Sequence, residues 1–283
     1  MRSDKPNGST RYDLPPAPLA LDGAAILHQM FRVRWAAMRA SQRREAICAE
    51  ACATLEAISR VEGGESAAFA ELGHKGDLML VHFRRAVEEL AVAELRLANI
   101  ALNEFLEPTG SYLSAVELGL YELSVGLYAK LAENGLRPHS AQWNEAVEAE
   151  FESQRHKMAA RLFPKIPERR YVCFYPMSKK RDEHKNWYRL PIDERRRLMH
   201  DHGLVGRRYA GQVTQIISAS TGLDDWEWGV DLFADDPLVF KRLVYEMRFD
   251  EASADYALFG PFYVGLRIAP QRFGDFLAGK LAL

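Results

Sequence analysis

The feature that most constrains the fold is a pattern that occurs twice along the chain. In each copy, hydrophobic periodicity and turn residues predict the order strand, helix, strand, strand, helix, strand. The elements expected in the first copy are 24–33, 43–60, 66–72, 77–83, 87–105 and 111–118. Those expected in the second are 171–177, 191–209, 212–218, 226–233, 236–251 and 256–266. This repetition predicts an α+β fold of two fused ferredoxin-like units, each with an antiparallel sheet and helices on its outer face.

The repeat predicts five parts. A polar, proline-containing start indicates a flexible N-terminal tail over 1–20, followed by an N-terminal ferredoxin-like domain over 21–118. Residues 119–167 are rich in Glu, Lys and Arg and favour helix between Ala141 and Leu162, so we expect a helical connector with a mobile part. The second ferredoxin-like domain spans 168–268, and 269–283 is a C-terminal tail.

Bulk composition excludes several classes of function. A formal net charge of -2 argues against nucleic acid or an anionic membrane surface as the main partner. No apolar run approaches the roughly 18 residues of a membrane span, and the start of the chain does not resemble a signal peptide. Three scattered cysteines argue against a disulfide framework. We therefore expect a cytoplasmic protein.

One run of five residues, Tyr175-Pro176-Met177-Ser178-Lys179, combines an oxidisable phenol with an ammonium group. Side chains alternate along a strand, so Tyr175, Met177 and Lys179 share one face if the chain stays extended. Tyr175 is also explained as a core aromatic, and Lys179, beside two more basic residues, as part of a solvated turn. If the side chains act together, they indicate a haem-type pocket.

The helix expected at 191–209 carries two histidines. His202 lies on its apolar stripe and points inward, whereas His200 has mainly charged neighbours and is expected on the solvated face. From spacing alone, a buried histidine bonded to backbone is the simpler explanation of His202. Gly203 and Gly206 each cost a helix about 1 kcal/mol relative to alanine, which is understandable if something flat approaches the helix closely. They can equally mark fraying near the helix end.

Three other polar residues are candidates for ligand contacts. Gln215 lies in the middle of an expected strand, where its amide needs hydrogen-bond partners from the protein or from a ligand. Arg161 is otherwise an exposed helix charge, and Ser253 a helix-end hydroxyl. The chain has no P-loop, no G-x-G-x-x-G after a strand, no zinc-ligand spacing and no G-x-S-x-G motif.

At these residues the chain resembles the chlorite dismutase family, and within it the coproheme decarboxylase branch. The resemblance runs from about Leu21 to Gly265. Its carriers are Leu27–Phe31, Gly73–Leu78, Tyr175–Lys179, Asn186–Tyr188, His202–Gly203, Tyr209–Gly211, Asp224–Gly229 and Glu246–Ser253. The resemblance implies two fused ferredoxin-like units of the dimeric α+β barrel type, assembled as a ring-shaped homopentamer.

The resemblance also implies roles for the candidate residues. Tyr175 matches the radical-forming catalytic tyrosine, and His202 matches the axial iron ligand. The positions expected to contact the porphyrin and its propionates are Arg161, Tyr175, Pro176, Met177, Ser178, Lys179, Gln215 and Ser253. Coproheme carries four carboxylates, which cations and hydroxyl donors bind through charge-assisted hydrogen bonds.

The implied activity is that of a peroxide-dependent oxidoreductase of haem biosynthesis. Hydrogen peroxide oxidises bound iron-coproporphyrin III (coproheme), and Tyr175 takes a hydrogen from a propionate, which loses carbon dioxide and becomes a vinyl group. Two rounds give haem b, so the iron porphyrin is both substrate and redox centre. The expected partners are this porphyrin, further copies of the chain and, transiently, a ferrochelatase-type enzyme, with no nucleic acid and no membrane span.

Two alternative functions stay open. Chlorite-cleaving members of the family place an arginine above the iron, where this chain has the neutral Gln215, which weakens the case for a chlorite dismutase or haem peroxidase. A non-catalytic haem carrier or sensor is the second alternative. It would use the same pocket without releasing carbon dioxide.

Overall fold

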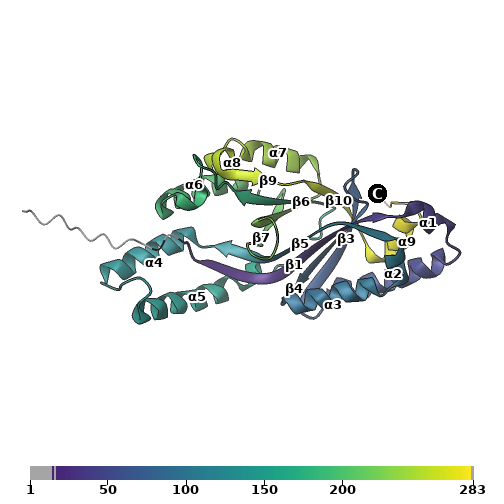
Figure 1. Cartoon of the computed structure of the whole chain (residues 1–283), viewed down its shortest axis with the longest axis horizontal. Coiled ribbons are helices and arrows are strands. Elements are labelled where there is room, and N and C mark those ends of the chain that lie inside the picture. The colour runs from purple at the N-terminus through teal and green to yellow at the C-terminus, as the bar shows by residue number, and fades with distance from the viewer. Residues whose placement is uncertain (1–14, 16, 282–283) are drawn as a thin grey trace, which may run out of the picture.

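In the computed structural model, which describes residues 15 and 17–281, the strands of both units join in one antiparallel sheet (Figure 1). The order is β10-β3-β4-β1-β5-β7-β8-β6, and β10 also pairs with β6, so the sheet closes as a barrel. The barrel strands are β1 Ala20–Val33, β3 Gly64–Leu72, β4 Leu78–Arg84, β5 Leu106–Gly119, β6 Tyr171–Lys179, β7 Thr214–Ala219, β8 Trp228–Ala234 and β10 Tyr263–Ile268. Two short strands, β2 (Arg60–Val61) and β9 (Ala257–Phe259), pair with β3 and β6.

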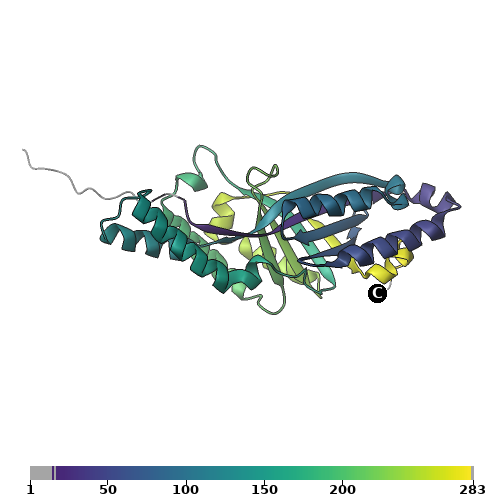
Figure 2. The same cartoon turned by 90° about the horizontal axis from the view of Figure 1, so that it is seen from below.

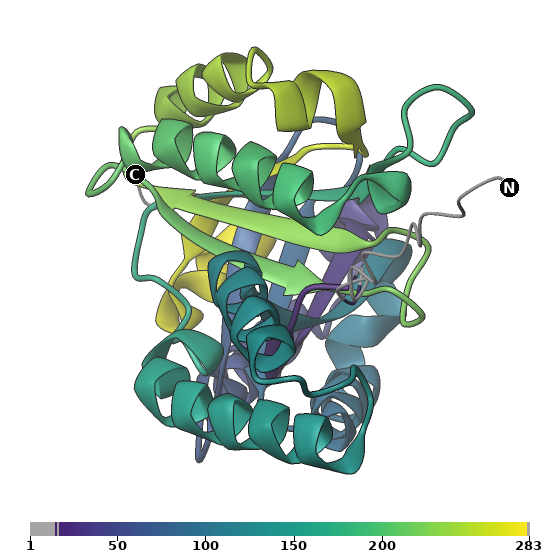
Figure 3. The same cartoon turned by 90° about the vertical axis from the view of Figure 1, so that its left-hand side faces the viewer.

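Helices cover the outside of the barrel. Those beside the N-terminal strands are α1 Trp35–Ala40, α2 Arg44–Ser59, α3 Val87–Ala98 and α9 Phe273–Leu277. The remaining helices are α4 Tyr121–Glu133, α5 Ala141–Leu162, α6 Ile192–Arg207, α7 Leu238–Met247 and α8 Glu251–Tyr256. Figure 2 shows α4 and α5 at one end of an elongated molecule and α2 and α9 at the other. Figure 3 shows α6, α7 and α8 on one side of the C-terminal strands, with α4 and α5 on the other. The predicted α+β fold with helices outside is confirmed.

Apolar side chains of both units fill the barrel. The buried residues that meet there include Ile26, Met30, Phe69, Tyr112, Phe174 and Phe233. A second core lies outside β3 and β4, where α2 and α9 bury Leu55 and Phe273. The outer face of the N-terminal strands is therefore closed by helices, so a large cavity has room only on the C-terminal half.

The sequence prediction was wrong at the end of the first unit. The helix expected over 87–105 ends at Ala98, because Ile100 is extended and a 3₁₀ turn, Ala101–Phe105, follows it. Strand β5 then begins at Leu106, earlier than the predicted residue 111.

Two elements of the second unit are also divided. The helix expected over 236–251 is α7 followed by α8, because extended Asp250 stops one helix and caps the next. The strand expected over 256–266 is interrupted after β9 at Gly260-Pro261, and Pro261 has no N–H to donate to a ladder. Two further 3₁₀ turns are Trp187–Arg189 and Pro270–Arg272.

The chain ends behave differently from each other. Most of the N-terminal tail expected over 1–20 lies outside the described residues. In the C-terminal tail expected over 269–283, Phe273, Phe276 and Leu277 are buried, so this segment contributes to the core. The connector helix has the predicted bounds, 141–162. Within the described part of the chain, no helix has the length and apolar character required to cross a membrane.

Candidate functional site

A cavity of about 910 Å³ lies between the outer face of the C-terminal strands and the surrounding helices. Its size falls in the range of sites that hold organic ligands. Seven of the predicted site residues line it, namely Arg161, Tyr175, Met177, Lys179, His202, Gln215 and Ser253. Side chains from α5, β6, α6, β7 and α8 therefore meet in one place.

Strand β6 presents alternate residues to the cavity. Tyr175, Met177 and Lys179 line it, as the period of two requires. Pro176 and Ser178 are not among the lining residues. The Ser178 hydroxyl accepts a hydrogen bond from the backbone N–H of Glu227 at 3.3 Å. Side-chain contact between a ligand in this cavity and Pro176 or Ser178 therefore has no support in the structure.

Tyr175 presents a protonated phenol to the cavity. Tyr175 is only 4% exposed, and its ring stacks on the ring of Phe262, with the two centroids 4.5 Å apart. Burial raises the pKa of the phenol well above its usual range, with a smaller contribution from Cys173. None of the described residues forms a hydrogen bond with the hydroxyl. Its hydrogen is therefore retained at neutral pH and is free for a reaction partner.

Lys179 supplies a buried cation on the same face. Its Nζ lies 4.2 Å from the centroid of the Trp187 ring and donates to the carbonyl oxygen of Ala252 at 3.4 Å. Burial lowers the pKa of the ammonium to about 8, against the opposing effects of Asp250 and Glu227. A carboxylate entering the cavity would find a partly unsatisfied cation there.

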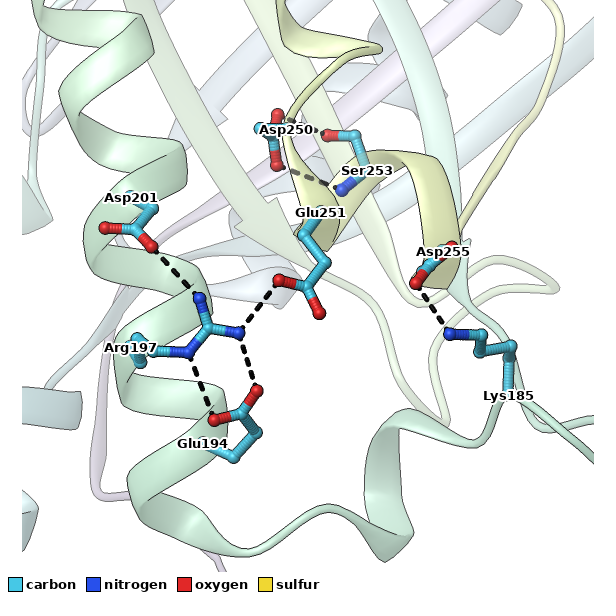
Figure 4. Close-up of polar contacts among 8 residues, drawn as sticks. All are labelled: Lys185, Glu194, Arg197, Asp201, Asp250, Glu251, Ser253 and Asp255. Atoms are coloured by element: carbon cyan, nitrogen blue, oxygen red, sulfur yellow. Dashed lines mark hydrogen bonds and ion pairs between the residues drawn. The ribbon is translucent and has the colours of Figure 1, made fainter.

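His202 projects from α6, and its Nδ1 lies 3.0 Å from Oδ2 of Asp250. Figure 4 shows Asp250 held in turn by Ser253, whose hydroxyl and backbone N–H both donate to its carboxylate at 2.9 and 3.0 Å. Burial raises the pKa of Asp250, but the bonds from His202 and Ser253 outweigh it, and the net pKa is below the usual range. An ionised carboxylate can only accept, so Nδ1 donates, and in the neutral imidazole Nε2 then carries the lone pair. No described residue bonds to Nε2, which is therefore available to a metal ion.

Asp250 was missed in the sequence analysis. It lies three residues before Ser253 and just before α8, in the position of a helix N-cap. That spacing could have located the start of α8. It does not reveal contact with His202, which comes from a helix 48 residues earlier in the chain.

The α6 surface facing the cavity is open at Gly203. A Cβ added at Gly203 would meet no protein atom within 4 Å, whereas one at Gly206 would lie 3.4 Å from Cε of Met247. His200 also lines the cavity, with its side chain 48% exposed and its Nδ1 3.7 Å from Glu122. The supporting carboxylate therefore distinguishes His202 from His200 as a ligand candidate.

Three exposed cations line the cavity: Arg161, Lys165 and Arg207. They have no ion pair with any residue that the structure describes. Of the three, only Arg161 is predicted from the sequence. Together with Lys179 they make the cavity suited to a ligand with several carboxylates, while Ile217 and Val230 supply an apolar floor. The residues present thus fit an iron porphyrin that has acidic side arms.

The fold is a duplicated ferredoxin-like α+β barrel, and its cavity lies on the outside of the strands. The histidine supported by a carboxylate and the several cations in this cavity are typical of a protein that binds an iron porphyrin. The family model for chlorite dismutase matches residues 44–268. The chain belongs to the chlorite dismutase family.

Relatives with whole-length similarity include the coproheme decarboxylase of Staphylococcus saprophyticus, 39% identical over 94% of this chain and 100% of its own. A candidate heme-binding protein of Natronomonas pharaonis is 42% identical, but this chain spans only 41% of that protein's length. This chain spans 48% of the length of a similar protein of Haloquadratum walsbyi. Among solved structures, a heme-binding protein of Thermus thermophilus has 37% identity and a TM-score of 0.80 over 94% of this chain and 99% of its own. A chlorite dismutase of Candidatus Nitrospira defluvii, at 17% identity and a TM-score of 0.67 over 91% and 96% of the two chains, shares the fold.

Proposed function

We propose that this chain binds iron-coproporphyrin III and converts two of its propionates to vinyl groups with hydrogen peroxide, giving haem b. The observation that carries the proposal is that Tyr175, Lys179 and His202 line one cavity of about 910 Å³. The similarity to the S. saprophyticus coproheme decarboxylase over that protein's whole length supports this choice of substrate. The ring-shaped homopentamer remains a prediction.

Each group in the cavity has a distinct part in holding the substrate. Nε2 of His202 would bind the iron, and Asp250 fixes the imidazole in the tautomer that leaves this nitrogen free. Arg161, Lys165 and Arg207 would bind propionates by charge-assisted hydrogen bonds. The apolar floor excludes water from the face of the macrocycle.

Tyr175 performs the hydrogen transfer. The iron porphyrin, on reaction with peroxide, supplies the oxidising equivalents. Tyr175 then loses its phenolic hydrogen as a proton and an electron, and regains it from the carbon of a propionate arm. That arm gives up a further electron to the same peroxide-derived oxidising equivalents and releases carbon dioxide as the vinyl double bond forms. Each round consumes one propionate, one peroxide and one proton, and yields a vinyl group, carbon dioxide and two waters.

Gln215 argues against chlorite as the substrate. It lies on the floor of the cavity, and a neutral amide provides no fixed positive charge to hold an oxyanion. Lys179 lies on the same face of β6 as Tyr175 and is placed to hold a propionate of the bound macrocycle.

The test combines purified protein, iron-coproporphyrin III and peroxide, with products identified by mass spectrometry. Tyr175→Phe should bind the porphyrin with an unchanged absorption spectrum and lose decarboxylation by at least about a hundredfold. The matched control is Tyr209→Phe, because Tyr209 is also buried but bonds to Glu246 and does not line the cavity. His202→Ala should alter the absorption spectrum of the iron.

Other results would assign a different function. Haem b production at the normal rate by Tyr175→Phe would remove the radical role. A wild-type protein that binds haem b but releases no carbon dioxide from coproheme would be a carrier or sensor. Rapid oxygen evolution from chlorite would indicate a dismutase.

A further inference from the structure

The pairing of the strands places Tyr175 and Glu117 at opposite sides of the cavity floor. Tyr175 on β6 pairs with Val230 on β8, and Val230 pairs with Ile217 on β7. The β5–β7 ladder ends one residue before Glu117, which continues along β5 beside Ile217. The row from Tyr175 to Glu117 crosses three strand spacings, at most about 14 Å. The two residues therefore lie on opposite sides of the floor.

The other two sides carry positive charge. Lys179 is the last residue of β6. Strands β6 and β7 both run antiparallel to β8, so both begin at the end of the sheet away from Lys179. Lys165 precedes β6 and Arg207 precedes β7, and both line the cavity. Arg161 also lines it, but from α5, whose last residue, Leu162, packs against Gly23 of β1. Cations are thus available at both ends, with Tyr175 on the third side.

Glu117 makes the fourth side acidic. Its carboxylate lines the cavity and accepts a hydrogen bond from Nε1 of Trp228 at 3.2 Å. Asp22 lies directly opposite it on β1, and Tyr121 of α4 faces the same region. Among the described residues no cation pairs with Glu117, whereas Glu122, the other carboxylate of the lining, is paired with Arg196. A propionate placed at this side would meet an uncompensated negative charge.

The order of substituents on coproporphyrin III matches these four sides. Each pyrrole ring carries one methyl and one propionate, and in the type III isomer one ring is reversed. One edge of the macrocycle then has two methyls and no carboxylate, the edge across from it has one propionate, and an edge between them has two. In the type I isomer every edge carries one propionate.

We propose that Glu117 is a specificity-determining residue that repels propionates and so selects the type III isomer. This inference rests on the proposed function. The methyl-only edge would lie at Glu117, which directs the single propionate of the opposite edge to Tyr175. The edge with two propionates would meet Lys165 and Arg207, and the remaining propionate would meet Lys179. A type I macrocycle must place a propionate at Glu117 in every orientation.

Binding of the metal-free porphyrins, followed by their fluorescence, tests the selectivity without requiring the reaction. Burial raises the pKa of Glu117, an effect that the hydrogen bond from Trp228 opposes and Asp22 increases, so we would measure at pH 8, far above the usual range of a carboxyl group. Wild-type protein should bind coproporphyrin III about tenfold more tightly than coproporphyrin I. Glu117→Gln can still accept from Trp228 and should bring the two affinities to within about twofold, mainly by tightening type I.

The matched control is Glu122→Gln, which removes the ion-paired carboxylate of the same cavity and should keep the wild-type ratio. Thermal unfolding of both variants checks that each is folded. Equal affinities in the wild type, or an unchanged ratio in Glu117→Gln, would overturn the role of Glu117 while leaving the proposed function standing. Failure of the wild type to bind either isomer, and to bind iron-coproporphyrin III as well, would overturn both.

Discussion

Lys179 is the residue whose charge state should control substrate binding within the ordinary pH range. Burial lowers its pKa to about 8, so the ammonium is charged below that pH in the free protein. A bound propionate raises the pKa of its partner, so affinity should be constant below about pH 8 and fall as the pH rises through the interval between the free and bound values. We expect a loss of about tenfold in affinity across that interval.

Porphyrin titrations between about pH 6.5 and 9.5 would measure this dependence. Lys179→Met keeps a long apolar side chain beside Trp187 without the charge, and should bind weakly with a flatter profile. If wild type and Lys179→Met lose affinity in parallel above pH 8, another group is responsible.

The alternation of side chains along β6 predicted which of its residues face the cavity. It also shows that two of the residues predicted to contact the ligand face away from it. The period of two placed Tyr175, Met177 and Lys179 on one face, and the same rule assigns Pro176 and Ser178 to the other face, although the family resemblance had included them. Asp250 and Glu117 carry no such signal. Asp250 matters because α8 lies against α6, and Glu117 because β5 lies beside β7, which are contacts between distant segments.

At the scale of elements, the site depends on how α8 is attached to α6. Figure 4 shows Arg197 of α6 between three carboxylates: Glu194 and Asp201 of its own helix, and Glu251 at the start of α8. The Arg197–Glu251 distance is 2.8 Å, and Glu251 is adjacent to Asp250. This cluster therefore positions the carboxylate that supports His202.

We expect Arg197→Gln to lower the melting temperature slightly and to weaken porphyrin binding at low ionic strength, because three carboxylates are left to repel one another. The cluster is exposed, so 1 M salt, with a Debye length of about 3 Å, should remove most of the difference from wild type. Lys185→Gln is the matched control, since it removes one ion pair to α8, with Asp255, and leaves Arg197 with its three carboxylates. A difference that persists in full at high salt would show that Arg197 acts through packing instead.

Element boundaries depended on capping residues that periodicity does not reveal. The apolar pattern continues from α7 into α8, so the expected helix over 236–251 ran through Asp250. The structure stops α7 at Met247 because Asp250 adopts an extended conformation and its side chain caps α8. The bounds of α5 were predicted correctly, since Ser140 caps its start and the chain is helix-prone throughout.

For the whole molecule, the repeat predicted two sheets, and only the family resemblance implied that they close into one barrel. Closure depends on β10 pairing with both β3 and β6, and on a short contact between β5 and β7. These ladders join strands that are remote in sequence, which local patterns do not encode. The closure leaves a shared interior, and that interior contains a polar contact between the two units.

His28 of β1 and Asp231 of β8 form this contact inside the barrel, with Nε2 and Oδ1 2.9 Å apart and both side chains 0% exposed. The His28 ring stacks on Phe174 at 3.9 Å between centroids. The second nitrogen of His28 and the second oxygen of Asp231 have no partner among the described residues. Among the described residues, each of these two side chains therefore has the other as its only side-chain hydrogen-bond partner, and both lie in an apolar core.

Removing one partner leaves the other buried without compensation, so Asp231→Leu should destabilise the fold by about 3–5 kcal/mol. The double variant His28→Phe, Asp231→Leu replaces the whole contact with apolar groups and should recover most of that loss. Denaturant unfolding of the two single variants and the double variant, analysed as a double-mutant cycle, measures the coupling. Additive losses would mean that the units are joined by the ladders and the apolar core alone, whereas strong coupling would show that the His28–Asp231 pair fixes how the two halves of the barrel meet.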